Sequence, residues 1–367
     1  MAEELKDVKF DGEEQVEDES LGDDVIAPIR YDISSYGADY DVEGLVKRLD
    51  RGDILVPQFQ RNYVWNHAEA SRFIESLLLG LPVPAIFLAR EPKSNKLLVI
   101  DGQQRLKTLQ FFYNGYFNPQ EEEEKRRIFK LIRVQSEFEG LTYEALSEND
   151  RIKLNDSLIH AIIIKQESPK DDDTSIYQIF DRLNSEGRSL TPQEIRAAVD
   201  HGDFIDFIKE LNDYKPWREI YGKKNSRLKD QELILRFLAF YFDGDSYEKP
   251  MKEFLNKFSQ KKRKIGQSFL AQARDIFTFT IDVVYESLGR EAFRPTRSIN
   301  AAVFDSVMVG LARRIETSSG LDENRVKNAY DDLLSNEKYL ELISQSTSDE
   351  KNVSERFQMA MEKFGSV

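Results

Sequence analysis

The spacing of apolar residues changes near Ser175, and this change separates two kinds of structure. Before it, short apolar runs alternate with segments of helical periodicity. The strands and helices expected there are Ala85–Ala89, Lys96–Ile100, His160–Lys165, Ala68–Leu79 and Gly102–Asn114. After it, helical spacing continues through nearly all of the chain. We therefore predict an α+β fold, with a mixed N-terminal domain over residues 25–200 and a mostly helical domain over residues 201–367.

The first 24 residues are strongly acidic. They contain eleven Asp and Glu residues against Lys6 and Lys9, a net charge of −9, which leaves −5 for the rest of a chain whose total is −14. Because they contain few apolar side chains, residues 1–24 are predicted to form a disordered tail. Two interpretations stay open. The tail keeps the chain solvated, or it imitates nucleic acid and competes for a basic groove on the same chain.

The residue types present exclude several classes of protein. There is no cysteine, which removes disulfides, cysteine-bound metals and thiol nucleophiles. The three histidines, His67, His160 and His201, do not have the spacing of metal ligands. The longest apolar stretch, Leu77–Ala89, contains one glycine and two prolines and is shorter than the roughly 20 residues that span a bilayer. We expect a cytoplasmic protein with no membrane partner.

The segment Leu97–Leu109 has the clearest chemical pattern. An apolar strand runs into Asp-Gly-Gln-Gln-Arg, residues 101–105, and this turn opens a helix. The unpaired backbone N–H groups and the partial positive charge of a helix start suit a phosphate. Arg105 adds guanidinium donors on the first turn. Asp101 is a candidate ligand for a magnesium ion.

The amide side chains of this turn have two interpretations. Gln103 and Gln104 are candidates to orient a water or a ribose. Asp101 and Gln104 also have the spacing of a capping box, in which side chains satisfy the backbone of the helix start without any ligand. The two interpretations are compatible, because a capped helix end can still receive an anion.

A second cluster lies upstream, where Gln60 and Arg61 stand among aromatic residues. Arg61 is a candidate to contact a phosphate. Tyr63 and Trp65 are candidates to stack on a base or close a pocket, although aromatic residues in this pattern are also typical of a hydrophobic core. We favour the core for Trp65.

A third cluster leads into a predicted helix. Arg182 and Asn184 are candidates to face a ligand, and a glycine-containing turn follows them. Thr191 and Glu194 have the spacing of a capping box, with Pro192 at the first helical position. The cluster therefore predicts a new helix directly after the turn.

Basic residues gather in the helical part. The run that is the candidate nucleic-acid contact is Lys261, Lys262, Arg263 and Lys264. Such a run is more often a solvated helix face. The net charge of −5 outside the tail argues against a strongly basic binder, and weak or nucleotide-gated contact with DNA stays open.

Four motifs occur in an order that resembles one known family. They are Pro-x-Phe-Gln-Arg-x-Tyr-x-Trp at 57–65, Glu-Ser-Leu-Leu-Leu-Gly-Leu-Pro-x-Pro at 75–84, Asp-Gly-Gln-Gln-Arg at 101–105 and Leu-Asn-x-x-Gly-x-x-Leu-x-x-x-Glu-x-Arg at 183–196. This order resembles the DGQQR family, the N-terminal domain of GmrSD-type type IV restriction enzymes. That family is similar to the ParB and sulfiredoxin superfamily. The resemblance covers about residues 30–200.

The resemblance implies a nucleotide-binding domain with a ParB/sulfiredoxin-like fold. It implies that Ile100–Thr108 binds the phosphates of a nucleoside triphosphate held with Mg²⁺. The residues expected to bind the nucleotide are Gln60, Arg61, Gly102, Arg105, Thr108 and Asn184. The residues expected to take part in hydrolysis are Asp101, Gln103 and Gln104, with Asp101 as the metal ligand.

Three functions follow as hypotheses. The favoured one is a nucleoside triphosphatase that regulates or powers a restriction-like, DNA-targeting phage defence system. Multidomain relatives carry an HNH nuclease domain, and no His-Asn-His pattern follows residue 201 here, so the hypothesis requires a separately encoded nuclease or other effector. The alternatives are a nucleotide-gated interaction or DNA-binding module without hydrolysis, and a direct metal-dependent nuclease. Sulfiredoxin chemistry is excluded because it requires a cysteine.

Overall fold

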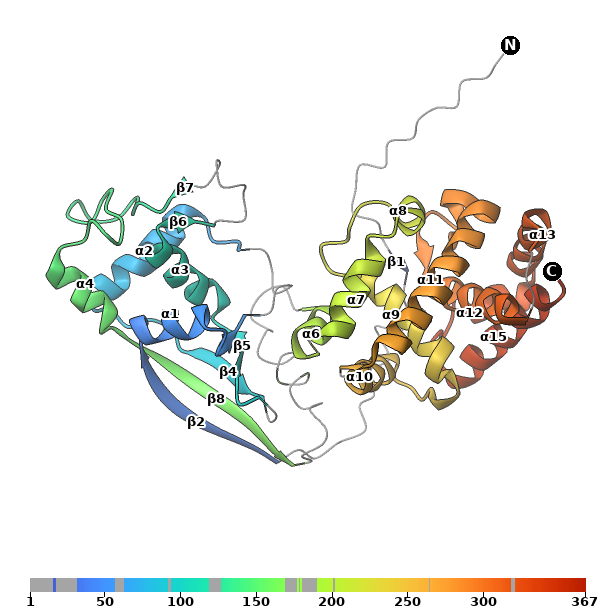
Figure 1. Ribbon diagram of the computed structural model, residues 1–367, viewed down its shortest axis with the longest axis horizontal. Helices are drawn as coiled ribbons and strands as arrows, with labels where there is room; N and C mark the ends of the chain where they lie inside the picture. Colours follow the sequence, from blue (N-terminus) through green and yellow to red (C-terminus); the bar gives the residue numbers. More distant parts are fainter. Residues whose placement is uncertain are drawn as a thin grey trace, which may run out of the picture. The chain divides into compact units, whose positions relative to one another are not determined.

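The computed structural model describes residues 16–17, 32–56, 63–91, 94–118, 127–168, 177, 179, 190–200, 202–263, 265–317 and 321–367. They form two compact units (Figure 1). One unit contains the described residues between Ile29 and Leu190, together with Ala197–Val199. The other contains Thr191–Arg196, Asp200–Val367 and a short strand near the N-terminus. The first unit is a mixed α/β structure and the second is helical, which confirms the predicted fold class.

A five-stranded mixed sheet forms the centre of the α/β unit. Its strands lie in the order β2-β8-β4-β5-β3. Their bounds are Asp32–Asp41 for β2, Leu158–Ser168 for β8, Ile86–Arg90 for β4, Leu97–Asp101 for β5 and Ile54–Leu55 for β3. β5 runs antiparallel to β4 and parallel to β3, whereas β8 runs parallel to β4 and antiparallel to β2. Because β3 and β5 are parallel, their carboxyl ends lie at the same edge of the sheet.

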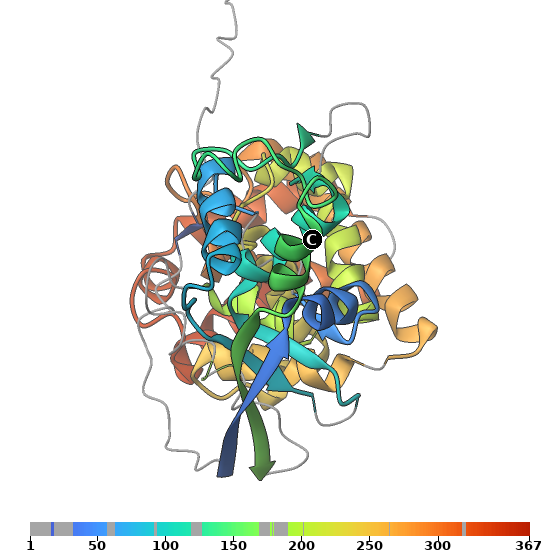
Figure 2. The same ribbon diagram turned by 90° about the vertical axis from the view of Figure 1, so that its left-hand side faces the viewer.

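Helices cover one face of this sheet (Figure 2). They are α1 (Val42–Asp50), α2 (His67–Leu78), α3 (Gln103–Asn114) and α4 (Glu148–Asn155). A small hairpin of β6 (Tyr116–Phe117) and β7 (Arg127–Ile128) follows α3. Alternate residues of β8, Ile159, Ala161 and Ile163, are buried, so they face the core that these helices complete. Asn66 and Glu69 form a capping box that fixes the start of α2.

The second unit is built from a succession of helices. They are α6 (Pro192–Val199), α7 (Asp203–Asn212), α8 (Lys215–Tyr221), α9 (Lys229–Asp243), η3 (Gly244–Ser246), α10 (Met251–Lys262), α11 (Gln267–Leu288), η4 (Gly289–Glu291), α12 (Ala301–Thr317), α13 (Glu323–Leu334), α14 (Glu337–Leu342) and α15 (Glu350–Gly365). α12 is the central helix, because its first twelve residues are all buried. The predicted capping box of Thr191 and Glu194 is present at the start of α6, with Pro192 at the first helical position.

A short strand from the acidic N-terminal segment belongs to the helical unit. Val16 and Glu17 form β1, which pairs in parallel with β9 (Ile299–Asn300). These two residues are thus ordered, in contrast to the predicted disordered tail of residues 1–24. The remainder of that tail lies outside the described residues.

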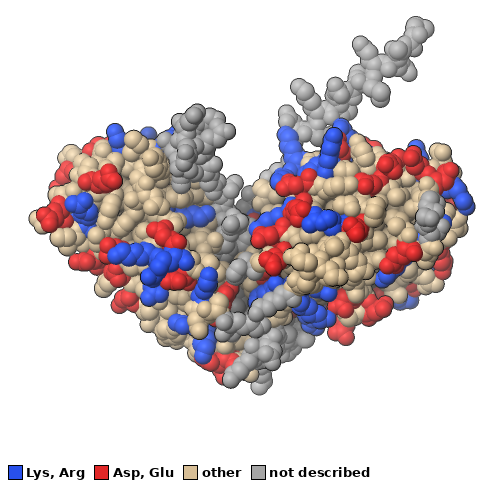
Figure 3. Space-filling model, viewed as in Figure 1, with Lys and Arg blue, Asp and Glu red and all other residues tan. Residues whose placement is uncertain are grey.

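Charges of both signs are distributed over the surface. On the face shown in Figure 3, Lys and Arg side chains lie among Asp and Glu side chains in each unit. This mixture agrees with the small net charge of −5 outside the N-terminal segment.

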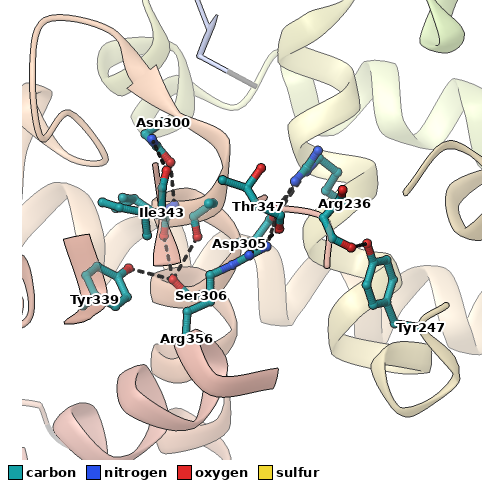
Figure 4. Close-up of polar contacts among 12 residues, drawn as sticks. Arg236, Tyr247, Asn300, Asp305, Ser306, Tyr339, Ile343, Thr347 and Arg356 are labelled. Atoms are coloured by element: carbon teal, nitrogen blue, oxygen red, sulfur yellow. Dashed lines mark hydrogen bonds and ion pairs between the residues drawn. The ribbon is translucent and has the colours of Figure 1, made fainter. Parts of the chain in front are cut away.

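One buried carboxylate connects three helices of the second unit (Figure 4). Asp305 on α12 accepts hydrogen bonds from Arg236 on α9, with 2.6 Å between Asp305 Oδ2 and Arg236 Nη2. Nη2 of Arg356 on α15 lies 3.9 Å from the same oxygen, and Arg356 also donates to the carbonyl of Thr347. All three charged side chains are almost completely buried. The cluster therefore fixes the mutual arrangement of α9, α12 and α15.

Candidate functional site

The turn between β5 and α3 requires glycine. Gly102 has φ 99°, in the left-handed region that side chains other than glycine rarely adopt. A Cβ atom built at this position would lie 2.4 Å from Cγ2 of Ile86 on β4, far inside van der Waals contact. The absence of a side chain thus lets the chain turn directly from the sheet into the helix.

The start of α3 has no side-chain cap. Gly102 is itself the N-cap residue and, being glycine, offers no side chain to accept a hydrogen bond from the first turn. The predicted capping box of Asp101 and Gln104 is therefore wrong, because Asp101 lies one residue before the cap. The first bond of the helix runs from Leu106 N–H to the Gly102 carbonyl. Among the described residues, no group accepts from the backbone N–H of Gln104 or Arg105, so these donors are available to an anion.

Asp101 and Arg105 form an ion pair across this turn. Arg105 Nη2 donates to Asp101 Oδ2 at 2.6 Å. The Arg105 side chain is 12% exposed, whereas the Asp101 side chain is 45% exposed. The structure therefore brings together the predicted phosphate ligand and the predicted metal ligand. A partly exposed carboxylate of this kind can accept further bonds from solvent or from a hydrated cation.

The next two predicted residues make contacts within the protein. Gln104 Oε1 accepts from the backbone N–H groups of Val64, at 3.0 Å, and Trp65, at 3.3 Å. Thr108 Oγ1 donates to the Gln104 carbonyl at 2.7 Å and lies 2.6 Å from the hydroxyl oxygen of Tyr63. Burial raises the pKa of Tyr63. These contacts give Gln104 and Thr108 a positioning role, because they hold the chain entering α2 against α3.

The aromatic residues beside these contacts belong to the core. Tyr63 is almost completely buried and meets Phe111 edge to face, with ring centroids 4.9 Å apart. Trp65 packs in the same way against Phe73, at 5.6 Å. The core interpretation favoured for Trp65 is thereby confirmed.

A cleft of about 530 Å³ lies along another side of α3. The residues that line it are Leu49, Gly52, Ile54, Leu55, Val56, Lys107 and Gln110. They come from the end of α1, from β3 and its continuation, and from the second turn of α3. The sequence analysis did not single out Lys107. Its helical spacing from Gln110 and its place two residues after Arg105 are the signals that indicate it.

Several predicted site residues lie outside the described part of the chain. They are Gln60, Arg61, Asn184 and Lys264. Gln103, the remaining predicted residue of the turn, is 8% exposed. Asp101, Gly102, Gln103, Gln104, Arg105 and Thr108 thus make up the described part of the candidate site.

The comparison with known families agrees with this geometry. Residues 42–199 match the family described as the GmrSD restriction endonuclease, N-terminal domain. This segment is similar to the GmrSD N-terminal domain. It begins with α1 and ends with α6, and it includes the whole β5–Gly102–α3 turn. The resemblance inferred from the four ordered motifs is therefore confirmed.

A search of curated proteins adds one relative. A 95-residue segment is 34% identical to part of an uncharacterized protein of Methanocaldococcus jannaschii. The match covers 20% of this chain and 16% of that protein. The similarity is therefore local, and it carries no activity over to this chain.

The predicted nucleic-acid contacts lie in the helical unit, separate from the GmrSD N-terminal domain. Lys261 pairs with Asp243 at 2.8 Å, and Arg263 pairs with Asp200 at 2.8 Å. The ammonium group of Lys262 lies 4.0 Å from the ring centroid of Phe269, and burial lowers the pKa of Lys262. Each described member of the run thus has a partner within the protein, which weakens its attraction for phosphates. Nucleic-acid binding there stays a prediction.

The described residues offer neither a ready-made metal site nor a membrane-spanning helix. Within the described ranges, no group of three or more His, Cys, Asp or Glu residues could hold a metal ion. Any cation at Asp101 would therefore need oxygen atoms from a ligand or from water. None of the described helices combines the length and the apolar character needed to cross a bilayer.

Proposed function

We propose that the GmrSD N-terminal domain of this chain binds the phosphates of a nucleoside triphosphate at the start of α3 and hydrolyses the nucleotide. The observation that carries the proposal is the uncapped turn at Gly102, which leaves the N–H groups of Gln104 and Arg105 without acceptors among the described residues. Aligned N–H donors at a helix start bind phosphate oxygens through hydrogen bonds and the helix dipole.

The residues at this turn suit both the negative phosphates and the positive metal ion of a magnesium nucleotide. The Arg105 guanidinium can add a charge-assisted bond to a phosphate while Asp101 keeps it in place. The exposed side of the Asp101 carboxylate can bind hydrated Mg²⁺, which would neutralise phosphate charge during hydrolysis. In the proposed reaction, Gln103 and Gln104 take part in hydrolysis together with Asp101 and Arg105. The contacts of Gln104 with Val64 and Trp65 give it the positioning role.

We further propose that this nucleotide chemistry serves a restriction-like defence system against foreign DNA. The support is the family of the domain, which is described as the N-terminal part of a restriction endonuclease. A separate effector cuts the DNA in this account. The three histidines of the chain are isolated in sequence, and the described residues hold no group of three metal-ligating side chains.

Hydrolysis tests this proposal with Asp101→Asn, a change that keeps the shape of the side chain and removes its charge. Purified wild-type chain should release phosphate from at least one nucleoside triphosphate in the presence of Mg²⁺. Asp101→Asn should lower the rate by at least about tenfold, since a magnesium ligand is lost. Asp156→Asn is a matched control, because Asp156 lies at the end of α4, away from the α3 start.

The outcome also separates the competing functions. Equal hydrolysis by the wild type and Asp101→Asn would contradict the catalytic assignment. Nucleotide binding without any release of phosphate would support a non-hydrolysing switch instead. Cleavage of plasmid DNA by the chain alone, dependent on Mg²⁺ and abolished in Asp101→Asn, would support the direct nuclease.

A further inference from the structure

The cleft beside α3 contains a lysine, Lys107, whose ammonium group pairs with no carboxylate among the described residues. Lys107 lies in its wall and is half-buried, and no described residue forms a hydrogen bond or an ion pair with its ammonium group. Burial lowers the pKa of Lys107. By contrast, Lys47 on α1 is exposed and pairs with Glu43 at 2.9 Å. Partial burial of a charge is unfavourable unless an opposite charge compensates for it, so the Lys107 environment favours a bound anion.

The other polar residue in the cleft is held in a fixed orientation. The Gln110 side-chain Nε2 donates to Asp50 Oδ1 at 2.7 Å. Its Oε1 has no donor among the described residues and is available to a ligand. Cation and amide therefore lie one helical turn apart on the same side of α3.

The remaining side chains that line the cleft are aliphatic. Leu49, Ile54, Leu55 and Val56 provide surfaces suited to a flat ring, and Gly52 provides a wall without a side chain. The volume of about 530 Å³ lies within the range of small-molecule sites. A pocket that combines aliphatic side chains with one cation and one amide suits a ligand that joins a heterocycle to an anionic group.

The location of the cleft connects it to the candidate phosphate site. β3 lies next to β5 and parallel to it, so the cleft is beside the strand whose carboxyl end leads into Gly102. Lys107 is two residues after Arg105, so the two side chains leave nearly opposite sides of α3. Both are reached from the helix start, because Lys107 is five residues after Gly102, about 7.5 Å along the helix axis, a length that one nucleotide spans.

We propose that the cleft between α1, β3 and α3 binds the base and sugar of the nucleotide, and that Lys107 contacts the phosphate nearest the sugar. This inference rests on the proposed function, which places the outer phosphates at Gly102–Arg105. Gln110 then offers an acceptor to a donor of the base or the sugar. The apolar walls pack against the faces of the base.

Binding measurements with three probes test this assignment. The probes are the nucleoside triphosphate that the wild type binds best, the matching monophosphate, and inorganic tripolyphosphate. Lys107→Met keeps an unbranched side chain, one heavy atom shorter, and removes its charge. It should weaken binding of the triphosphate and the monophosphate by about tenfold or more, and change tripolyphosphate binding by less than about twofold. Arg105→Ala should weaken the binding of both the triphosphate and tripolyphosphate.

Two control variants show whether the loss of affinity in Lys107→Met comes from the lost charge at that position. Lys153→Met, on the exposed face of α4, should bind all probes as the wild type does. Lys107→Arg keeps the charge and should restore at least part of the affinity. Circular dichroism on each variant shows whether the fold is retained. An azido derivative of the base should also crosslink to the peptide containing residues 49–56, as mapped by mass spectrometry.

Each result decides between the two proposals. Wild-type affinity of Lys107→Met for the triphosphate, with crosslinks elsewhere, would overturn the cleft assignment and leave the proposed function standing. An equal loss for tripolyphosphate and nucleotide in Lys107→Met would also overturn it, because the cleft would then hold outer phosphates. Failure of the wild type to bind any nucleotide would overturn both proposals.

Discussion

Gly102 is the residue at which the candidate site tolerates the least change. Gly102→Ala should destabilise the α/β unit, because it adds backbone strain of about 1–3 kcal/mol and an overlap with Ile86 that costs about as much again. The overlap follows from the 2.4 Å distance between the built Cβ and Ile86 Cγ2. Denaturant unfolding, followed by a probe within residues 32–168, measures the loss.

Gly140→Ala is the matched control for this change. Gly140 also has a positive φ, 80°, but an added Cβ would meet no atom within 4 Å. Gly140→Ala should therefore lower the stability of the α/β unit only by the backbone strain and leave the site intact. Equal destabilisation by the two substitutions would show that close packing at Gly102 is unimportant.

Several residue roles could not be predicted from local sequence. The Asp101–Arg105 pair replaces the expected capping box because Gly102, not Asp101, occupies the cap. Gln104 accepts from Val64 and Trp65, about 40 residues earlier in the chain. Such contacts depend on how α2 packs against α3, and spacing within one motif does not contain that information.

At the scale of elements, apolar runs predict buried strands well. The expected strands at 85–89 and 96–100 correspond to β4 and β5, and that at 160–165 lies within β8. β2 had no such signal, because most of its residues are polar and exposed. It is an edge strand that pairs with β8 along its whole length, so its backbone bonds define it where its side chains do not.

The buried Asp305 cluster leads to a prediction for the helical unit. Asp305→Asn should lower its free energy of unfolding by about 3–5 kcal/mol, because two buried guanidinium groups lose their shared counter-charge. Thermal unfolding monitored by circular dichroism at 222 nm measures the change. Asp331→Asn on the exposed side of α13 serves as the control and should have little effect. A stability equal to that of the wild type would mean that the two arginines do not need the carboxylate.

The N-terminal segment gives a prediction about DNA. Since β1 pairs with β9, part of the acidic segment lies on the helical unit, which also contains Lys261–Arg263. Deleting residues 1–24 removes a net charge of −9 and should tighten DNA binding at low salt, where screening is weak. Fluorescence anisotropy with labelled duplex DNA, at low and at physiological salt, measures the difference.

A charge-neutral tail distinguishes the effect of the acidic charge on DNA binding from the effect of the pairing between β1 and β9. Replacing the acidic residues of 1–24 with Asn and Gln keeps the segment and removes its charge. This variant should bind DNA as the deletion does. Equal DNA affinities for the wild type and both variants at low salt would favour the interpretation of a solvating tail.

At the scale of the whole molecule, the two-part organisation follows from periodicity. Alternating short elements predict the α/β unit, and continuous helical spacing predicts the helical one. The helical unit begins at Thr191, although Ala197–Val199 at the end of α6 belong to the α/β unit, and the predicted boundary lies at residue 200. The cleft at Lys107 could not be predicted in this way, because Lys107 and Gln110 on α3 come more than 50 residues after the residues of α1 and β3 that form its other walls.

Binding of nucleotide phosphates at the start of α3 can be measured by isothermal titration of nucleotide into the full chain. The wild type should bind at least one nucleoside triphosphate. Arg105→Ala should weaken that binding by about tenfold or more, since it removes a charge-assisted contact of about 1.5–3 kcal/mol. Arg72→Ala, on the exposed face of α2, should leave it unchanged. An Arg105→Ala variant that keeps the fold and the full nucleotide affinity would contradict the account.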